Sequence, residues 1–353
     1  MKVAVGLSGG VDSSVAAMLL RKQGHDVVGI RMTVWDDSLP AIKGPHACFG
    51  PDEKHEIESA RRIAEKLSIP FHTIDVSREY HSRVLGYFKA EYLQGRTPNP
   101  CIRCNQHIKF SALLDNARDK GVLFDCFATG HYARMLHDKG KNRYILSKGR
   151  DGAKDQSYWL AFLSQPQLSR ALFPLGEYTK EQVRHMARDH GLITSEKPDS
   201  QDFLSDAVSE TLGITSEPGP IRDKNGTRRG THKGICHYTI GQRKGLGIAA
   251  PHPLYVTGID PENNVLIVGP KSDLARDELT ASHINCVSIE AFHDAMHVRA
   301  KIRYTHVPAA ATLSLLDKEK LTVTFHTPQT AVTPGQAIVF YDGDVLLGGA
   351  IIE

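Results

Sequence analysis

The stretch that decides the fold is Val3-Ala4-Val5-Gly6-Leu7-Ser8-Gly9-Gly10-Val11-Asp12-Ser13-Ser14. Its first five residues predict a buried strand, and the glycines then predict a tight turn into a helix. Val11, Val15 and Met18 share one face of that helix, and Gly24 is placed to end it. Glycines let a backbone approach a ligand closely, and a helix N-terminus carries partial positive charge. The loop is therefore suited to hold an anion such as a phosphate.

The loop differs from the usual P-loop, because no Gly-Lys-Ser or Gly-Lys-Thr follows it. The order Ser-Gly-Gly-Val-Asp-Ser at residues 8–13 instead resembles the pyrophosphate loop of the N-type ATP pyrophosphatases. Those enzymes cleave ATP between the α- and β-phosphates and adenylate an oxygen of their substrate. The resemblance implies an ATP site formed by Gly6, Leu7, Ser8, Gly9, Gly10, Val11, Asp12 and Ser13.

The composition is that of an ordinary soluble globular protein, with 41% hydrophobic and 24% charged residues. A length of 353 residues predicts two or three domains. We expect neither a membrane span nor a secretory signal in residues 1–20. Six cysteines are too few for a disulfide scaffold, so we expect a reducing, cytoplasmic location. The net charge of +3 does not by itself indicate nucleic-acid binding.

Residues 1 to about 130 alternate between strand and helix patterns. The predicted strands cover residues 3–7, 27–30, 71–74 and 124–129. A helix separates each strand from the next, the last of these helices at about 105–119. This alternation predicts an α/β fold, a parallel sheet with helices on both faces. Ligands of such sheets lie beyond the carboxyl ends of the strands, where the loop at Ser8 and residues 128–131 would meet.

The rest of the chain predicts two further units. Helical patterning continues to about residue 190, and Thr179 and Gln182 form a capping box there. Glycine, proline and short strands dominate from about 218 to 270, with a predicted hairpin of 254–259 and 265–268. Alternating runs from about 280 onward predict a small antiparallel barrel. We expect the domains to cover residues 1–203, 204–278 and 279–353.

Two cysteines follow a proline-rich segment, Thr97-Pro98-Asn99-Pro100-Cys101-Ile102-Arg103-Cys104. The prolines exclude a helix before residue 100, so we expect both thiols at the start of the next helix, where its dipole favours the thiolate. A Cys-x-x-Cys pair indicates redox chemistry, cluster ligation or sulfur transfer. The remaining cysteines in predicted strands, Cys126, Cys236 and Cys286, are expected to pack in the core.

Eight motifs, in order, resemble the bacterial tRNA-specific 2-thiouridylases over nearly the whole chain. They are Ser8–Ser14, Arg96–Pro100 with Cys104, Ala128–Ala133, Lys154–Tyr158, Tyr238–Gly247, Arg303-Tyr304, Thr333–Gln336 and Leu347–Glu353. The resemblance implies an ATP pyrophosphatase domain, a small central domain and a C-terminal β-barrel, the last two helping to hold tRNA. It also implies that ATP adenylates O2 of the wobble uridine, and that sulfur replaces this oxygen as AMP leaves.

The resemblance also assigns roles to single residues. Cys104 matches the nucleophilic cysteine, and we expect Cys104, Cys101 and Asp12 to be catalytic, Asp12 by helping to hold Mg²⁺. Met32 and Gly130 match adenine-side contacts of ATP. The residues that match tRNA contacts are Asn99, Pro100, Cys101, His131, Lys154, Asp155, Gln156, Arg303, Tyr304 and Gln336. The position of Cys101 often carries aspartate in the family.

One position departs from the family pattern. Most members have a second catalytic cysteine after an Asp-Ser pair, and this chain has Leu204 there. An aliphatic side chain carries no sulfur, so three possibilities stay open. Cys48, Cys101 and Cys104 bind a [4Fe-4S] cluster with one open iron, or Cys104 carries a persulfide that Cys101 or Cys48 resolves, or the chain uses neither carrier. The sulfur itself would come from a donor protein or from sulfide.

A basic cluster follows the predicted pyrophosphatase domain. It comprises Arg222, Lys224, Arg228, Arg229 and Lys233. With the neighbouring Tyr238 and Gln242, such a surface is suited to grip phosphates and to bond a base. Two other interpretations stay open: an adenylating paralogue that acts on another tRNA base or a thionucleobase, and a tRNA-binding module without enzymatic activity.

Overall fold

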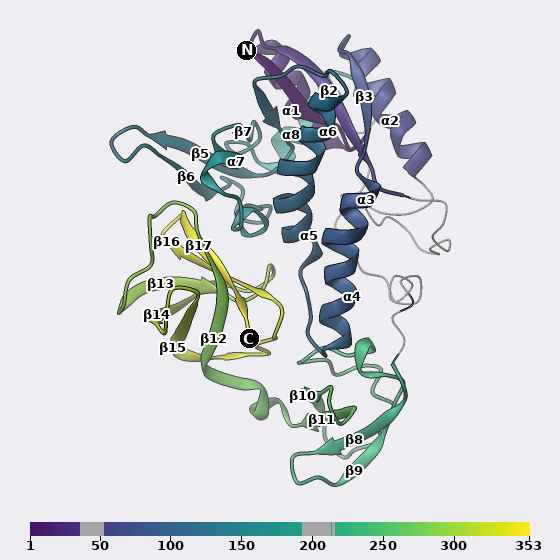
Figure 1. The fold of residues 1–353 in the computed structure, drawn as a ribbon, viewed down its shortest axis with the longest axis vertical. Helices are drawn as coiled ribbons and strands as arrows, with labels where there is room; N and C mark the ends of the chain where they lie inside the picture. The colour runs from purple at the N-terminus through teal and green to yellow at the C-terminus, as the bar shows by residue number, and fades with distance from the viewer. Residues whose placement is uncertain (36–52, 193–212, 214–215) are drawn as a thin grey trace.

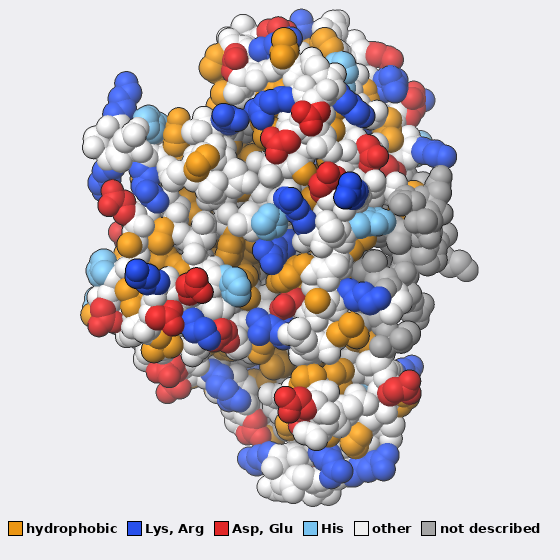
Figure 2. Space-filling model, in the orientation of Figure 1, with side chains coloured by type: hydrophobic (Ala, Val, Ile, Leu, Met, Phe, Trp, Pro, Cys, Tyr) orange, Lys and Arg blue, Asp and Glu red, His pale blue; other side chains and the backbone are white. Residues whose placement is uncertain are grey.

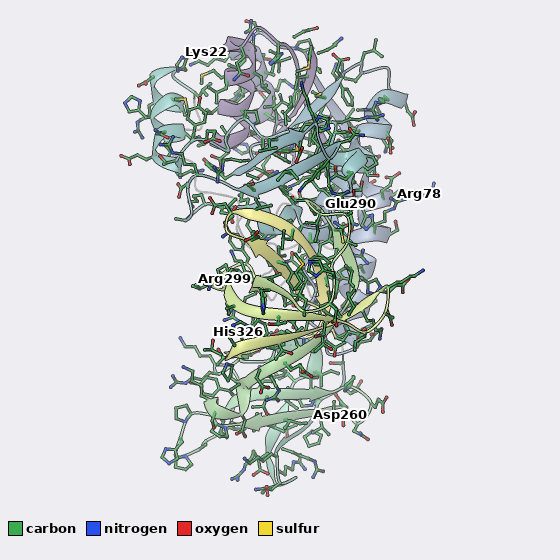
Figure 3. All side chains as sticks on the ribbon, turned by 90° about the vertical axis from the view of Figure 1, so that its left-hand side faces the viewer. Lys22, Arg78, Asp260, Glu290, Arg299 and His326 are labelled. Carbon is green, nitrogen blue, oxygen red and sulfur yellow. The ribbon has the colours of Figure 1, made fainter. Side chains whose placement is uncertain are left out.

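A computed structural model describes residues 1–35, 53–192, 213 and 216–353 of the chain (Figure 1). Three parts lie along its long axis. In Figure 3, Lys22 marks the N-terminal part at one end, Arg299 the C-terminal barrel in the middle, and Asp260 the central part of the sequence at the other end. Within the described ranges, no helix is both long and apolar enough to cross a membrane.

The N-terminal part is built on a five-stranded parallel sheet with the order β3-β2-β1-β4-β7. Its strands are β1 Lys2–Gly6, β2 Asp26–Thr33, β3 Phe71–Asp75, β4 Cys126–Ala128 and β7 Ala171–Leu172. Val3, Ala4 and Val5 of the central strand β1 are completely buried. Burial of consecutive residues is typical of a strand covered on both faces. The predicted parallel sheet is confirmed.

Helices cover both faces of this sheet. They are α1 Val11–Lys22, α2 Glu53–Lys66, α3 Ser77–Tyr80, η1 His81–Leu85, α4 Gly86–Leu93, α5 Pro100–Arg103, η2 Cys104–Ala112, α6 Leu113–Asp119, η3 Ser157–Leu160, α7 Gln165–Leu168 and α8 Lys180–Asp189. Helices α1, α2 and α8 share one core, and η1, η2 and α6 share the other. The two-sided arrangement follows from side chains that alternate across each strand.

The C-terminal part is a closed six-stranded antiparallel barrel, as predicted. Its strands are β12 Ala275–Cys286, β13 Met296–Lys301, β14 Ala309–Leu315, β15 Lys320–Thr330, β16 Ala337–Asp342 and β17 Val345–Ile352. They follow the order β12-β15-β14-β13-β16-β17, and pairing of β12 with β17 closes the barrel. Every second residue fills the interior, as Ala311 and Leu313 of β14 do.

The central part is a four-stranded sheet with the order β10-β11-β8-β9. Its elements are β8 Gly219–Asp223, β9 Arg228–His232, η4 Ile235–His237, β10 Tyr255–Asp260, β11 Val265–Gly269 and η5 Lys271–Leu274. The predicted hairpin of β10 and β11 is confirmed. The prediction of a strand at Cys236 is wrong, because this buried cysteine lies in the short 3-10 helix η4. Cys126 and Cys286 do lie in strands, although both are only half-buried.

Residues 133–148 also differ from the prediction of helix up to residue 190. They form a hairpin, β5 Ala133–Asp138 and β6 Arg143–Lys148, that extends the barrel sheet through β17. The side chain of Arg134 bonds Asp344 at 2.9 Å across this junction. Short apolar runs in a sequence do not distinguish a strand from a helix. Here β6 pairs with β17 of the barrel, and this pairing favours the strand. The hairpin thereby joins the barrel to the N-terminal part.

Candidate active site

A cavity of about 240 Å³ lies at the carboxyl ends of β1, β2 and β4. The predicted ATP-binding residues that line it are Gly6, Leu7, Ser8, Gly10, Val11, Asp12, Ser13, Met32 and Gly130. Gly9 belongs to the same loop. The structure thus brings together residues from three strand ends that are distant in sequence, at the edge where parallel sheets bind ligands.

Two glycines of the cavity region have no room for a side chain. Gly9 adopts a φ of +81°, and a Cβ there would lie 3.0 Å from the carbonyl oxygen of Glu56. At Gly130, a Cβ would lie 2.8 Å from backbone atoms of both Asp12 and Ser13. The end of β4 therefore touches the start of α1 directly, and this close approach fixes the shape of the phosphate-binding loop.

Hydrogen bonds hold the loop in place. The Ser14 hydroxyl donates to the carbonyl oxygen of Gly10, the residue before α1, at 2.7 Å. Arg31, a buried residue of β2, donates to the carbonyl oxygen of Ser8 at 2.6 Å and pairs with Glu56 at 2.5 Å. The first N–H groups of any helix lack partners within the helix, so a loop fixed in this way offers those of α1 to an anion.

Asp12, the second residue of α1, has two strong partners. The ammonium group of Lys180 lies 2.8 Å from each of its carboxylate oxygens, and the Tyr132 hydroxyl donates to Oδ1 at 2.7 Å. Lys180 is the first residue of α8 and is nearly buried. The Thr179 capping box at the start of α8 is confirmed and fixes the position from which Lys180 reaches Asp12.

Both cysteines lie at the start of a helix, as predicted. Asn99 is the cap residue, whose side chain accepts a hydrogen bond from the Ile102 N–H at 3.3 Å, and Pro100 is the first helical residue. Cys101 is half-buried, and Cys104 is 8% exposed. A helix N-terminus stabilises negative charge, so this location suits thiolate chemistry.

The cysteine helix leads into the cavity wall. Helices α5, η2 and α6 form one continuous helical segment from Pro100 to Asp119, kinked at Phe110 (Figure 1). Lys109 and Leu113 of this segment line the cavity. Cys104 precedes Lys109 by five residues. One helical segment therefore connects the thiols to the wall of the nucleotide cavity.

The predicted tRNA-contacting residues divide into three groups. His131, Lys154 and Gln156 line the cavity. Asn99 and Pro100 lie at the cysteine helix, where Gln336 of the barrel donates to the Thr97 carbonyl oxygen at 3.0 Å. This hydrogen bond holds the segment before Cys101 against the barrel.

The other members of that set have structural partners. The buried Asp155 carboxylate accepts hydrogen bonds from the N–H groups of Gly149 and Ser157, both at 3.1 Å. Arg303 donates to the Thr330 carbonyl oxygen at 3.2 Å. Tyr304 stacks on Trp159, with ring centroids 4.0 Å apart.

His131 is held in a neutral state. Burial in the cavity wall, and to a lesser extent the nearby Lys109 ammonium group, lower the pKa of this histidine well below its usual range. Its Nδ1 lies 2.7 Å from the Thr129 hydroxyl, and the ring packs against Phe110 and Phe173. A neutral imidazole at this place contacts a ligand by hydrogen bonding rather than by charge.

Two residues of the sulfur-carrier hypothesis, Cys48 and Leu204, lie outside the described residues. Among the residues that the structure describes, no three side chains of His, Cys, Asp or Glu gather closely enough to hold a metal ion. The placement of the predicted ligand set Cys48, Cys101 and Cys104 therefore stays a prediction.

Several residues at the cavity were not predicted from the sequence. They are Arg31, Glu56, Lys109, Tyr132 and Lys180. The capping box placed Lys180 at the start of a helix, and the absence of a lysine in the loop was a signal that another element supplies one. Among Arg31, Glu56, Lys109 and Tyr132, the sequence signal is clearest for Arg31. It lies at the end of a predicted strand region, directly before Met32, and this position indicates the cavity.

Comparisons with known proteins agree with this architecture. Residues 1–204 match the family described as tRNA methyl transferase HUP domain, residues 202–270 the tRNA methyl transferase PRC-barrel domain, and residues 276–352 the aminomethyltransferase beta-barrel domain. A solved structure of NMN synthetase from Francisella tularensis covers 61% of this chain and 72% of its own, with 18% identity and a TM-score of 0.34, too low to carry an argument.

Relatives match over the full length. The chain is 46% identical over 360 residues to tRNA-specific 2-thiouridylase MnmA 2 of Thermoanaerobacter sp. (strain X514), covering 100% of this chain and 98% of that protein. It is 48% identical over 356 residues to tRNA-specific 2-thiouridylase MnmA of Endomicrobium trichonymphae, covering 100% and 99%. The cavity, the cysteine helix and the barrel thus occur in one chain with this similarity, and the chain belongs to the tRNA-specific 2-thiouridylase family.

Proposed function

We propose that this protein catalyses the ATP-dependent 2-thiolation of the wobble uridine of tRNA. ATP occupies the cavity and adenylates O2 of the uridine, which releases pyrophosphate. Sulfur then bonds to C2, and the C2–O bond breaks as AMP leaves. A carbonyl oxygen is a poor leaving group, and its phosphoester is a good one. Full-length similarity to the named 2-thiouridylases supports this assignment.

The proposal depends on one observation: the two thiols and part of the cavity wall belong to the same helical segment. Cys101 and Cys104 lie at its start, and Lys109 and Leu113 lie in the cavity wall. An activated pyrimidine must meet both the α-phosphate and the incoming sulfur. A single helical segment carries both the thiols and part of the cavity wall, and such a reaction requires that its sulfur and its nucleotide be positioned together.

The acceptor positions of Asp12 fit a Mg²⁺ ion. A carboxylate has about four acceptor positions, and the described hydrogen bonds from Lys180 and Tyr132 use three of them. Asp12 and the phosphates of ATP would hold the ion. Mg²⁺ neutralises triphosphate charge when it is bound. Lys180 holds the Asp12 carboxylate in position, and Arg31 holds the loop through Ser8.

The sulfur carrier is proposed in two forms. Cys48, Cys101 and Cys104 would hold a [4Fe-4S] cluster, which supplies an open iron for sulfide. In the other form, Cys104 carries a persulfide whose outer sulfur attacks C2. The thiolate of Cys101 or Cys48 then attacks the Cys104 sulfur, which breaks the S–S bond, releases the 2-thiouridine and leaves a disulfide between the two cysteines that an external thiol reduces. The thiols of Cys101 and Cys104 are three residues apart on one helix, a spacing that suits either form. Sulfide would replenish the sulfur on a cluster, whereas a donor protein that itself carries a persulfide would replenish the persulfide on Cys104.

The rest of the chain is proposed to hold tRNA. We place the domain boundaries at residues 1–203, 204–278 and 279–353. Figure 2 shows Lys and Arg side chains gathered at the lower end of the molecule, where β8 and β9 lie. Part of this charge is neutralised, because Arg229 pairs with Asp223 at 2.6 Å. The remaining positive charge suits contacts with phosphates, which position a nucleic acid without reading its sequence.

The proposal is tested by anaerobic reconstitution. The purified protein is mixed with a tRNA transcript, Mg²⁺, ATP and sulfide, and the nucleosides are analysed by mass spectrometry. We expect one AMP and one pyrophosphate for each 2-thiouridine formed, and no product with a transcript that carries cytidine at the wobble position. Thiolation of a different base would instead support the paralogue interpretation.

The same preparation distinguishes the two sulfur carriers. Iron and acid-labile sulfide in the purified protein, with activity lost on chelation, would support the cluster. An iron-free protein that is active with a persulfide donor would support the persulfide. Product formation without AMP release would contradict adenylation itself.

A further inference from the structure

A stacked aromatic pair bridges the N-terminal part and the barrel. The rings of Trp159 in η3 and Tyr304 in the loop after β13 have centroids 4.0 Å apart and planes inclined by 18°. Both side chains are only half-buried. Aromatic pairs in a core usually pack edge-to-face or at an offset and are fully enclosed. A half-exposed parallel pair between two domains is suited to contact a ligand.

The pair lies beside the cysteine helix. The Asn105 side chain donates to the Trp159 carbonyl oxygen at 3.1 Å, and Asn105 directly follows Cys104. Cys101, Trp159 and Tyr304 also pack against one and the same hydrophobic core, which contains Cys104. The Asn105 hydrogen bond therefore places the backbone of Trp159 beside the start of the cysteine helix.

A cation completes the arrangement. The Lys301 ammonium group of β13 lies 5.1 Å from the ring centroid of Tyr304 and 5.8 Å from that of Tyr158. Partial burial lowers the pKa of Lys301, and the nearby Asp155 carboxylate partly opposes this effect. A lysine beside stacked rings is the combination that single-stranded nucleic-acid sites use, the rings for bases and the cation for the backbone.

We propose that Trp159 and Tyr304 form the stacking surface for an unpaired base of the tRNA anticodon loop, with Lys301 at the adjoining phosphate. The inference rests on the proposed function for the identity of the RNA. An enzyme that modifies a base must first remove it from its stack, and this costs free energy. Stacking of a base on an aromatic surface next to Cys104 offsets that cost at the place where the base is needed.

The tryptophan content of the chain makes a direct test possible. The sequence contains two tryptophans, Trp35 and Trp159, so the variant Trp35→Phe reports Trp159 alone. We expect an anticodon stem-loop RNA, added without ATP, to change the fluorescence of this variant. The fluorescence change should saturate with RNA concentration and should give the same Kd as fluorescence anisotropy of the labelled RNA. Unchanged emission at saturating RNA would overturn the proposal.

A second measurement compares two aromatic stacks. We expect Trp159→Leu to weaken RNA binding about 5- to 100-fold, with Trp159→Phe close to the parent and ATP affinity unchanged in both. The control is Tyr144→Leu, because Tyr144 stacks on His137 at 4.5 Å in the β5–β6 hairpin. An equal loss in the control, or no loss in Trp159→Leu, contradicts the proposal. Neither assay needs thiolation, so a wild-type protein that binds RNA without forming 2-thiouridine would refute only the proposed function.

Discussion

The Lys180 ammonium group forms a bidentate ion pair with Asp12, at 2.8 Å from each carboxylate oxygen. Lys180 is the first residue of α8 and Asp12 the second residue of α1, and most of the N-terminal part separates these two helices in sequence. Residues 8–14 contain no lysine, and the cation that pairs with the acid of this loop comes from α8. Lys180 therefore holds the Asp12 carboxylate in place, although it lies outside the phosphate-binding loop.

The first prediction concerns this pair. Lys180→Met leaves the half-buried Asp12 charge without its main partner, and we expect the free energy of unfolding to fall by about 2 kcal/mol. The KM for ATP should rise, because the loop loses a cation. Urea unfolding of Lys180→Met, Asp12→Asn and the double variant gives the coupling energy. Strictly additive effects of the two single substitutions would show that the pair does not contribute to stability.

The second prediction concerns the contact of β4 with α1. A Cβ at residue 130 would lie 2.8 Å from the backbone of Asp12 and Ser13, and backbone atoms cannot move aside as a side chain can. We expect Gly130→Ala to displace the loop and to lower kcat/KM for ATP by about 100-fold. The matched control is Gly152→Ala, where the new methyl group meets no atom within 4 Å. Similar ATP kinetics for both variants would contradict the assigned role of this contact.

The third prediction separates the thiols from the nucleotide cavity. We expect Cys104→Ser to reduce 2-thiouridine formation to about one-thousandth or less, while ATP affinity is retained because the cavity wall begins farther along the helix. Cys126→Ser is the control, since Cys126 begins β4 and lies at the end opposite the cavity. A Cys104→Ser protein that still thiolates tRNA would remove this residue from the mechanism.

The sequence allowed prediction of the features that depend on local pattern. The strand, glycine loop and helix of residues 3–22, the capping box at Thr179 and the barrel strands all follow from hydrophobic periodicity, capping residues and turn residues. The β5–β6 hairpin was missed because its short apolar runs fit either helix or strand, and β17 lies some 200 residues away. Spacing along the chain also gives no information on side-chain partners such as Lys180 with Asp12 or Trp159 with Tyr304.

The fourth prediction is a pH dependence centred on His131. Its pKa is lowered by burial in the folded protein, whereas in the unfolded chain a histidine titrates near pH 6.5. Below about pH 6.5 the unfolded chain therefore binds more protons at this residue than the folded protein does. The contribution of His131 to the free energy of unfolding should fall as the pH drops from about 6.5 toward the folded-state pKa, and should be constant above that range.

The variant His131→Asn isolates this contribution, because the asparagine side chain does not titrate and retains a polar group for the Thr129 hydroxyl. Urea unfolding between pH 5 and 8 should give a shallower loss of stability for the variant than for the wild type below about pH 6.5. Above about pH 7 the two curves should run parallel, since both side chains are then neutral in both states. Parallel curves over the whole range would mean that His131 takes up its proton in the folded protein as readily as in the unfolded chain, and the lowered pKa assigned to His131 would be wrong.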